Sequence, residues 1–407
     1  MPEQHFIVPI PGIQIQHSEQ TALAVFLRCS VNLPSVLHCP RCQSTQVRIK
    51  AYVSRELKHA FWTHKLVCLH LKVPKLHCLQ CHRYFMAPVP GILPKKRATE
   101  QFRKEVFELH HGGITQKHLS ITHKIATATV ERWYQDFVAY RVKELDGRQA
   151  PLILGIDEHF FSRKQGYATT FVDLKNHKVF DVVLGRSEAA LKAFLERLKG
   201  RDRVRVVVMD LSETYRAIVK KYFPNAMIVA DRFHVIRVLN HHFLKLWQTL
   251  DPDGRKNRGL LSLMRRHAWN LKPEQIPKLE GYFKKIPGLK EVYEFKQDLT
   301  KILLKKHLTQ QAAKAIIPQF LWHLNECLQS PWESLQTFGK TLSSWMEPIV
   351  RMWRFTKTNG ITEGLHNKME MISRRAFGFR NFKNYRLRVI ALCGWNGLFR
   401  FLSVSGG

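Results

Sequence analysis

Hydrophobic residues recur at two different spacings along the chain, and the changes of spacing divide it into segments. Residues 46–73 alternate apolar and polar positions as strands do, whereas residues 100–113 place apolar side chains on one face of a helix. Strand-like runs return at residue 151, and helical spacing dominates residues 238–350. The pattern therefore predicts a multidomain α/β protein.

The strand-like runs after residue 151 have a recognisable order. "LILGID", "GYATTFVDL" and "KVFDVVLG" predict an antiparallel meander, and a helix capped by Ser187 follows. A buried strand then ends at Asp210, a second helix stops at Pro224, and a further buried strand ends at Asp231. The order βββαβαβ is that of an RNase H-like fold, in which the first strand is central and the fourth lies beside it. Asp157 and Asp210, at the ends of those two strands, are therefore expected to be neighbours.

Two carboxylates that lie so close repel each other unless cations neutralise them. A pair of divalent metal ions would neutralise this repulsion and support phosphodiester chemistry. Mg²⁺ suits an all-oxygen site with room for phosphate. After a predicted turn at Asn359-Gly360, Glu363 opens a helix and is the candidate third ligand, with Glu370 on the same face as the alternative. For any one of these acids, a strand-end or helix-cap role is the competing interpretation.

Four cysteines form two CxxC pairs, Cys39 with Cys42 and Cys78 with Cys81. Each pair fits a tight turn that aims both sulfurs at one ion, and strand-like sequence separates the pairs, which predicts a zinc ribbon with a structural Zn²⁺ site. Incidental turns with free thiols are the alternative. The other cysteines lie in apolar surroundings and are predicted to be core residues: Cys29, Cys68, Cys327 and Cys393.

Residues 114–138 predict a short helix, a tight connection near Thr122 and a longer helix, which suits a helix-turn-helix. The exposed face of the longer helix, with Thr127, Thr129 and Arg132, is then a candidate for contact with a DNA major groove. An ordinary three-helix bundle remains the alternative, because the connection lacks a glycine.

The composition favours nucleic acid as the partner. The chain of 407 residues carries 65 Lys and Arg against 32 Asp and Glu, a net charge of +33 spread along its whole length. No stretch approaches about 18 uninterrupted apolar residues, and the first residues lack the pattern of a signal peptide, so we expect a soluble cytoplasmic protein without a membrane partner. Near the C-terminal end, cationic residues alternate with aromatic ones and are candidates for contact with DNA: Arg374, Arg375, Arg380, Lys383 and Arg386.

These segments predict five domains or parts of domains. They are a zinc ribbon (1–92), a helix-turn-helix domain (93–150), the first part of the RNase H-like core (151–237), an α-helical insertion (238–350) and the C-terminal part of the core (351–407).

The whole set of motifs resembles the bacterial insertion-sequence DDE transposases of the ISL-three type. The resemblance spans nearly the whole chain and rests on the CxxC pairs, the helix-turn-helix, "GIDE", "VADRFH" and "TNGITEGLHNKMEMISRRAFGFRNF". It implies a transposase that binds terminal inverted repeats and cuts and joins DNA with Mg²⁺ or Mn²⁺. By motif position, Asp157, Asp210 and Glu363 would hold the metal.

The resemblance also assigns a role to the "DRFH" segment. Asp231 and His234 look like the C/D(2)H element of related transposases, which supports the site or the DNA. In an alternative reading, Asp231 rather than Asp210 is the second catalytic acid. The family further implies a homodimer or larger assembly on paired transposon ends and target DNA.

Two other functions fit the same motifs. One is a zinc-dependent DNA-binding regulator whose core has lost catalysis, and the other is a nuclease that hydrolyses DNA without joining strands. Cleavage assays with divalent metal and analysis of the products distinguish these functions from transposition.

Overall fold

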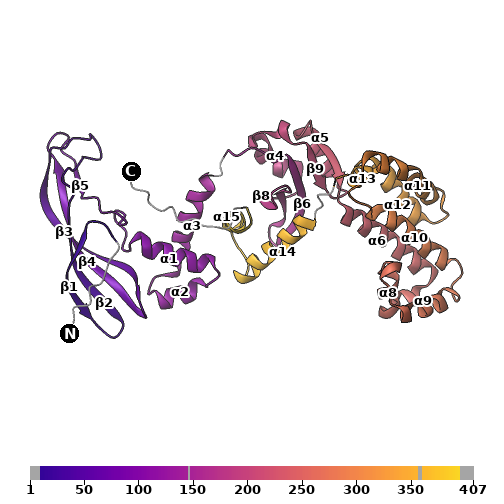
Figure 1. Ribbon diagram of the computed structural model, residues 1–407, viewed down its shortest axis with the longest axis horizontal. Coiled ribbons are helices and arrows are strands. Elements are labelled where there is room, and N and C mark those ends of the chain that lie inside the picture. The colour runs from indigo at the N-terminus through magenta and orange to yellow at the C-terminus, as the bar shows by residue number, and fades with distance from the viewer. Residues whose placement is uncertain (1–9, 145–146, 356–359, 395–407) are drawn as a thin grey trace. The chain divides into compact units, whose positions relative to one another are not determined.

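The computed structural model describes residues 10–144, 147–355 and 360–394, and the chain forms two compact units, Met1–Tyr140 and Arg141–Gly407 (Figure 1). Asn359, in the turn predicted at 359–360, lies outside the described residues. Among the described segments, no helix combines the length and apolar character that crossing a bilayer requires.

A sheet forms most of the first unit. Its strand order is β1-β2-β4-β3, with the short β5 paired to β4. The strands are β1 (Ile13–Gln20), β2 (Ala24–Val31), β3 (Val47–Trp62), β4 (Lys65–Cys78) and β5 (Tyr84–Met86). The alternation in residues 46–73 is thus confirmed as the long antiparallel hairpin of β3 and β4.

The central strand β4 is covered on both faces, because successive side chains of a strand point to opposite sides. Leu69, Leu71 and Val73 pack in the core on one face of the sheet. Leu66 and Cys68 point the other way, into a core that they share with helices. One strand therefore joins the sheet to the helical part of the first unit.

Three helices follow the sheet, as predicted: α1 (Glu100–His111), α2 (Gln116–Thr122) and α3 (Thr127–Glu144). Phe102, Leu119 and Trp133, one from each helix, meet in the shared core. The α2–α3 connection manages without glycine because Lys124 adopts a left-handed backbone with φ of 50°. Lys58 of β3 donates to the backbone oxygens of His123 and Lys124 and so holds this turn against the sheet.

The second unit is built on a sheet of strand order β10-β9-β6-β7-β8. Its strands are β6 (Ile153–Ser162), β7 (Gly166–Asp173), β8 (Lys178–Leu184), β9 (Val206–Met209) and β10 (Met227–Ala230). The meander β6-β7-β8 is antiparallel, whereas β6, β9 and β10 run parallel to one another. The prediction that the first strand is central and pairs with the fourth is confirmed by the pairing of Ile156 with Met209.

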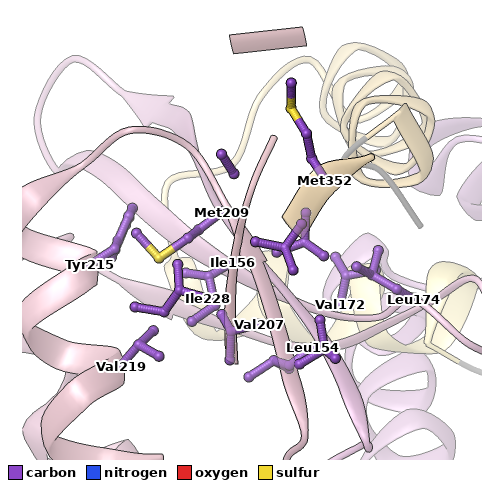
Figure 2. Packing of buried hydrophobic residues seen from close by; sticks show 14 of the residues in the cluster. Leu154, Ile156, Val172, Leu174, Val207, Met209, Tyr215, Val219, Ile228 and Met352 are labelled. Carbon is purple, nitrogen blue, oxygen red and sulfur yellow. The ribbon is translucent and has the colours of Figure 1, made fainter. Parts of the chain in front are cut away.

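Two helices between the strands begin at serine caps, as a side-chain oxygen can accept a free N–H of the first turn. They are α4 (Glu188–Arg197), capped by Ser187, and α5 (Glu213–Tyr222), capped by Ser212. Figure 2 shows Tyr215 and Val219 of α5 beside the apolar side chains of the strands, among them Met209 and Ile228. These contacts fix the strand ends where the acidic residues follow.

The segment predicted as helical is confirmed as helical. It contains α6 (Arg232–Leu250), α7 (Pro252–Lys256), α8 (Arg258–Arg265), α9 (Ile276–Phe283), α10 (Leu289–Leu304), α11 (Gln310–Gln329), α12 (Glu333–Ser344) and α13 (Met346–Met352). Its distal part has a separate core around Trp247 and Phe283. Phe320, Phe338 and Ile349, however, share the core of the sheet. Only the distal part is therefore packed independently of the sheet.

The helix α6 runs without interruption across the boundary predicted at residues 237 and 238. At its start, the buried Arg232 donates to three backbone oxygens, those of Leu303 at 3.2 Å, Lys305 at 3.1 Å and Met352 at 2.6 Å. Since these oxygens lie at the ends of α10 and α13, one side chain ties the beginning of α6 to the helices around it.

The last described helices, α14 (Gly360–Arg375) and α15 (Phe382–Cys393), return to the sheet, where α14 contacts β6 and α15 contacts β8. Gly155 of β6 makes this approach possible. A Cβ atom at that position would lie 3.1 Å from the Leu174 side chain and 3.2 Å from the Thr362 hydroxyl. The absence of a side chain at Gly155 therefore lets α14 pack close to the strand that carries Asp157.

Candidate active site and metal centre

Three aspartates stand where the parallel pairing of three neighbouring strands stops. Asp210 comes directly after β9 and Asp231 directly after β10, whereas Asp157 lies within β6, because the strand predicted to end there continues to Ser162 along β7. Since the parallel register ends at Ile156, Met209 and Ala230, the next residue of each strand lies at one edge of that pairing, and the structure brings the three carboxylates there. Asp157 and Asp231 are buried, and Asp210 is partly buried.

The electrostatics of this edge are those of a site short of positive charge. Burial raises the pKa of Asp157 to about 6, and the charges of Asp210 and Asp231 act in the same direction. Burial also raises the pKa of Asp210. The Oδ1 atom of Asp210 is buried and has no hydrogen-bond partner among the described residues. An unpaired buried carboxylate oxygen beside other acids is a fitting ligand for a divalent cation.

Asp231 is engaged in a different way from Asp210. Its Oδ2 atom accepts the backbone N–H of His234 at 3.3 Å, which caps α6, and lies 2.6 Å from Nδ1 of the same histidine. Burial acts to lower the pKa of His234, but the hydrogen bond and charge of Asp231 outweigh burial and raise that pKa. The charge of His234 in turn opposes the rise in the pKa of Asp157. Asp231 and His234 thus form a pair at the rim of the acid cluster.

The helix α14 reaches the cluster through a histidine that the sequence reasoning missed. Nδ1 of His366 lies 3.8 Å from Oδ2 of Asp157, and its Nε2 lies 3.0 Å from the hydroxyl of Thr170. Glu363, which is exposed, stands one turn before His366 on the same face of the helix. Glu370 stands one turn after His366 and pairs with Arg374 at 2.7 Å. The spacing of three residues from Glu363 was the available signal for His366.

His366 belongs to a chain of hydrogen bonds that extends to α15. Thr170 Oγ1 lies 2.9 Å from Nδ1 of His159, and Nε2 of His159 lies 2.9 Å from the hydroxyl of Tyr385. Burial lowers the pKa of His366 to about 4 and that of His159 to about 3, so both rings are neutral at pH 7. The chain therefore fixes α14 and α15 beside Asp157 without adding charge.

The four cysteines predicted to bind a metal come together at one end of the β3–β4 hairpin. Their sulfur atoms all lie within 4.8 Å of one another, with 3.5 Å from Cys39 to Cys81 and from Cys42 to Cys78. Zn–S bonds of about 2.3 Å in a tetrahedron place sulfurs roughly 3.8 Å apart. The donor set and its spacing therefore fit a four-coordinate zinc ion.

The two CxxC turns have the same backbone geometry. In each turn the residue after the second cysteine adopts a left-handed conformation, Gln43 with φ of 60° and His82 with φ of 58°. The N–H of each donates to the oxygen of the first cysteine, at 2.9 Å for Cys39 and 3.0 Å for Cys78. A backbone N–H aimed at sulfur lowers the pKa of the first thiol of each turn, to about 6 for Cys39. The first cysteine of each turn thus favours the thiolate form that binds metal, whereas burial and the neighbouring thiols raise the pKa of Cys42.

The cysteines predicted to be core residues are buried, as expected: Cys29, Cys68, Cys327 and Cys393.

The residues predicted to contact DNA in the first unit lie on the start of α3. Thr127 and Arg132 are exposed, whereas Thr129 is half-buried and its hydroxyl accepts from Arg132 at 3.2 Å. Thr129 and Arg132, three positions apart, are thus neighbours on one face of the helix.

The cationic residues near the C-terminal end have different environments. Arg374, Arg375, Arg380 and Lys383 are exposed. Arg386 instead makes a two-point ion pair with Asp181 of β8, at 2.6 and 2.7 Å. Its guanidinium is committed to holding α15 on the sheet, which is a structural role that the sequence alone did not indicate.

Comparison with known proteins gives two matches to transposases. The family model for transposases of the DDE type named ISL3 matches residues 154–389, more than half of the chain. The chain is also 24% identical over 379 residues to the transposase for insertion sequence element IS1001 of Bordetella parapertussis, across 91% of each protein. A third match, 30% identical over 132 residues, is a Lactococcus lactis subsp. lactis protein named ATP-dependent protease, and covers 30% of this chain and 40% of that protein.

The region matched by the family model contains all three strand-end aspartates and α14. The chain belongs to the ISL3-type DDE transposases. Membership of this family implies cleavage and strand transfer of DNA phosphodiesters with a divalent metal ion.

Proposed function

We propose that this transposase binds the terminal inverted repeats of its insertion sequence, cuts the DNA there and joins the 3′ ends to target DNA. In this proposal Asp157, Asp210 and Glu363 hold two Mg²⁺ or Mn²⁺ ions in an RNase H-like core. When bound, such a pair of ions activates the attacking oxygen and stabilises the leaving oxygen of a phosphodiester. The observation that carries the proposal is the buried, unpaired oxygen of Asp210 beside Asp157, whose pKa is raised.

Asp210 is the better second ligand because its Oδ1 has no hydrogen-bond partner, whereas Oδ2 of Asp231 caps α6 and binds His234. Asp231 and His234 have a supporting role, in which the raised pKa of His234 keeps positive charge beside the acids.

Glu363 is preferred to Glu370 as the third ligand. Both are one turn from His366, which lies beside Asp157, but Glu370 is paired with Arg374. The approach of Thr362 to Gly155, two residues before Asp157, supports a position of Glu363 on the Asp157 side of β6. The neutral His366 and His159 orient this helix and take no part as acids at neutral pH.

We assign the first unit to DNA recognition. A zinc ribbon formed around Cys39, Cys42, Cys78 and Cys81 would stabilise the hairpin, and α2 and α3 would act as a helix-turn-helix with Thr127, Thr129 and Arg132 in the major groove. The exposure of Thr127 and Arg132 supports that role.

In the second unit, Arg374, Arg375, Arg380 and Lys383 would contact phosphates near the site. Phe377, between them, is 92% exposed and has a left-handed backbone with φ of 53°. An aromatic ring held away from any core in this way is suited to stacking on a base.

The division into five parts is retained as a proposal, with 1–92 and 93–150 as the recognition domains, 151–237 and 351–407 as the core and 238–350 as the helical insertion. We further place the protein in the bacterial cytoplasm, on the nucleoid when bound to DNA, as a homodimer or larger assembly on paired ends.

The experiment that tests the proposal incubates the full chain with duplex DNA carrying the ends of its insertion sequence, a target plasmid and Mg²⁺. Wild type should cut and join strands, whereas Asp157→Asn, Asp210→Asn and Glu363→Gln should bind the DNA and do neither. Cutting without joining would indicate a nuclease, and binding without cutting by wild type would indicate a regulator. Wild-type activity in Asp157→Asn would refute the site.

A further inference from the structure

A groove lies along the exposed face of α6 in the helical region. It has a volume of about 510 Å³, and side chains of α6 from Phe233 to Gln248 form its length. Arg255 of α7 and Arg265 of α8 complete its wall. The residues of α6 that line the groove are spaced three or four positions apart, so they lie on one face of the helix and the groove runs along its axis.

The lining of this groove is cationic. Arg237, Lys245, Arg255 and Arg265 face it, and no acidic residue lines it. Throughout the described part of the chain, no carboxylate forms an ion pair with any of these four side chains. The adjacent Lys256, by contrast, pairs with Asp253 at 3.1 Å and does not line the groove.

Polar atoms in the groove wall also lack partners. Oδ1 of Asn240 and Nε of Arg255 are buried without a hydrogen-bond partner within the described residues. Arg255 is nevertheless held in place, since its guanidinium lies over the ring of Trp247 at 5.9 Å. Cations that no carboxylate pairs with, gathered in one groove, favour a polyanionic ligand.

The groove begins at the acid cluster. Its helix, α6, starts at the Asp231 cap, and the lining of the groove begins two residues after that aspartate, at Phe233. From Phe233 to Gln248 the helix rises roughly 22 Å, the length of about six or seven base pairs. A ligand along the groove is thus of a size and charge to be DNA that leads to the acids.

We propose that this groove binds the sugar-phosphate backbone of the duplex next to the phosphate that is cut. The proposal rests on the function proposed above and adds a DNA contact in the helical region to those proposed for the first unit and for residues 374–383. The contact is to phosphates and is independent of base sequence. The transposon DNA on one side of the cut and the flanking DNA on the other offer the same sugar-phosphate backbone to the groove.

The test measures how the affinity for end DNA falls with salt concentration, using the full chain and the double variant Lys245→Ala/Arg265→Ala. Both residues are exposed and neither touches the acid cluster, so the variant should fold as wild type and keep its thermal melting curve. The logarithm of the affinity falls linearly with the logarithm of the salt concentration, and each lost phosphate contact should make that slope less steep by about 1. The slope of the double variant should therefore be about 2 less steep than that of wild type. Lys256→Ala, which removes a charge outside the groove, should keep the wild-type slope.

Truncated duplexes then identify which DNA occupies the groove. Shortening the DNA on one side of the cut should remove the difference between wild type and the double variant, while shortening it on the other side should preserve the difference. A double variant with the wild-type slope on long DNA, or a slope equally reduced in Lys256→Ala, would overturn the proposal. Failure of the active-site assignment would appear separately, as cleavage by Asp157→Asn.

Discussion

The cysteine cluster and the acid cluster are both candidate metal sites, but they are assembled in opposite ways. The cysteines come from two turns at one end of a single hairpin, β3 and β4, and each turn positions its pair with its own backbone hydrogen bonds. The three aspartates come from three strands or their ends, spread over residues 157–231, and Glu363, their proposed partner, lies on α14 more than 200 residues after Asp157. The first site depends on local geometry, whereas the second exists only when the whole sheet has formed.

The largest effect that distinguishes the two sites is expected from Cys78→Ser, which removes a ligand of the first. Structural zinc contributes about 10 to 16 kcal/mol of apparent binding energy to small domains. Without it, the sheet of the first unit should unfold, or its backbone amides should lose their protection against hydrogen exchange. The acid site should be unaffected, because the second unit has its own core. Hydrogen exchange followed by mass spectrometry measures both units in one experiment. Loss of protection in β6 and β9 would show that the units are not independent.

A second effect compares two acids within the acid site. Asp210→Asn should lower the rate of DNA cleavage by at least about 10³-fold, since it removes a ligand without changing volume. Asp231→Asn should have a smaller effect, because asparagine can still cap α6. Single-turnover cleavage rates at saturating Mg²⁺ measure the two. The reverse order of effects would make Asp231 the second catalytic acid.

A third effect concerns stability without metal. The pKa of Asp157 is about 6 in the folded protein against an ordinary value of 3.8, so between these values the folded state holds a proton that the unfolded state has lost. Stability should therefore fall as pH rises through this window, and Asp157→Asn should be more stable than wild type at pH 7 by about 2 to 3 kcal/mol.

Denaturant unfolding in EDTA at pH 4, 5, 6 and 7 measures this difference. The advantage of Asp157→Asn should shrink towards pH 4, where the carboxyl is protonated, and Mg²⁺ should stabilise wild type more than the variant. A difference that does not depend on pH would mean that Asp157 is not buried beside other acids.

The smallest effect is expected at the far end of the hydrogen-bond chain beside Asp157. Tyr385→Phe removes the hydroxyl 2.9 Å from His159 and leaves a buried ring nitrogen without a partner, which should cost about 1 to 3 kcal/mol of stability. Cleavage should fall only modestly, since Tyr385 does not touch the acids. Thermal unfolding and cleavage rates measured on the same preparation separate the two, and loss of activity without loss of stability would contradict a purely positioning role.

The spacing of residues was enough to predict elements and local sites. The strand order, the serine cap of α4, the meeting of the four cysteines and the neighbouring ends of β6 and β9 were all accessible from the sequence, because each depends on periodicity or on short-range geometry. The contact of His366 with Asp157 was not accessible, since it depends on how closely α14 approaches β6 at Gly155.

Two further features depended on packing between distant segments. Arg386 was predicted to contact DNA from its basic and aromatic neighbours, yet its partner Asp181 lies 205 positions earlier in the chain. The helical region was predicted as one insertion, yet more of its buried apolar residues belong to the core of the sheet than to the separate distal core. Sequence periodicity identifies a buried face but does not say which surface covers it.

The unbroken course of α6 has a mechanical consequence. Its 19 residues include neither proline nor glycine, and Arg232 clamps its first turn to three carbonyl groups. A straight helix clamped at one end resists bending, so α6 keeps the distal helices at a constant distance from Asp231 and His234. DNA bound along α6 would therefore lie at a fixed distance from the three aspartates.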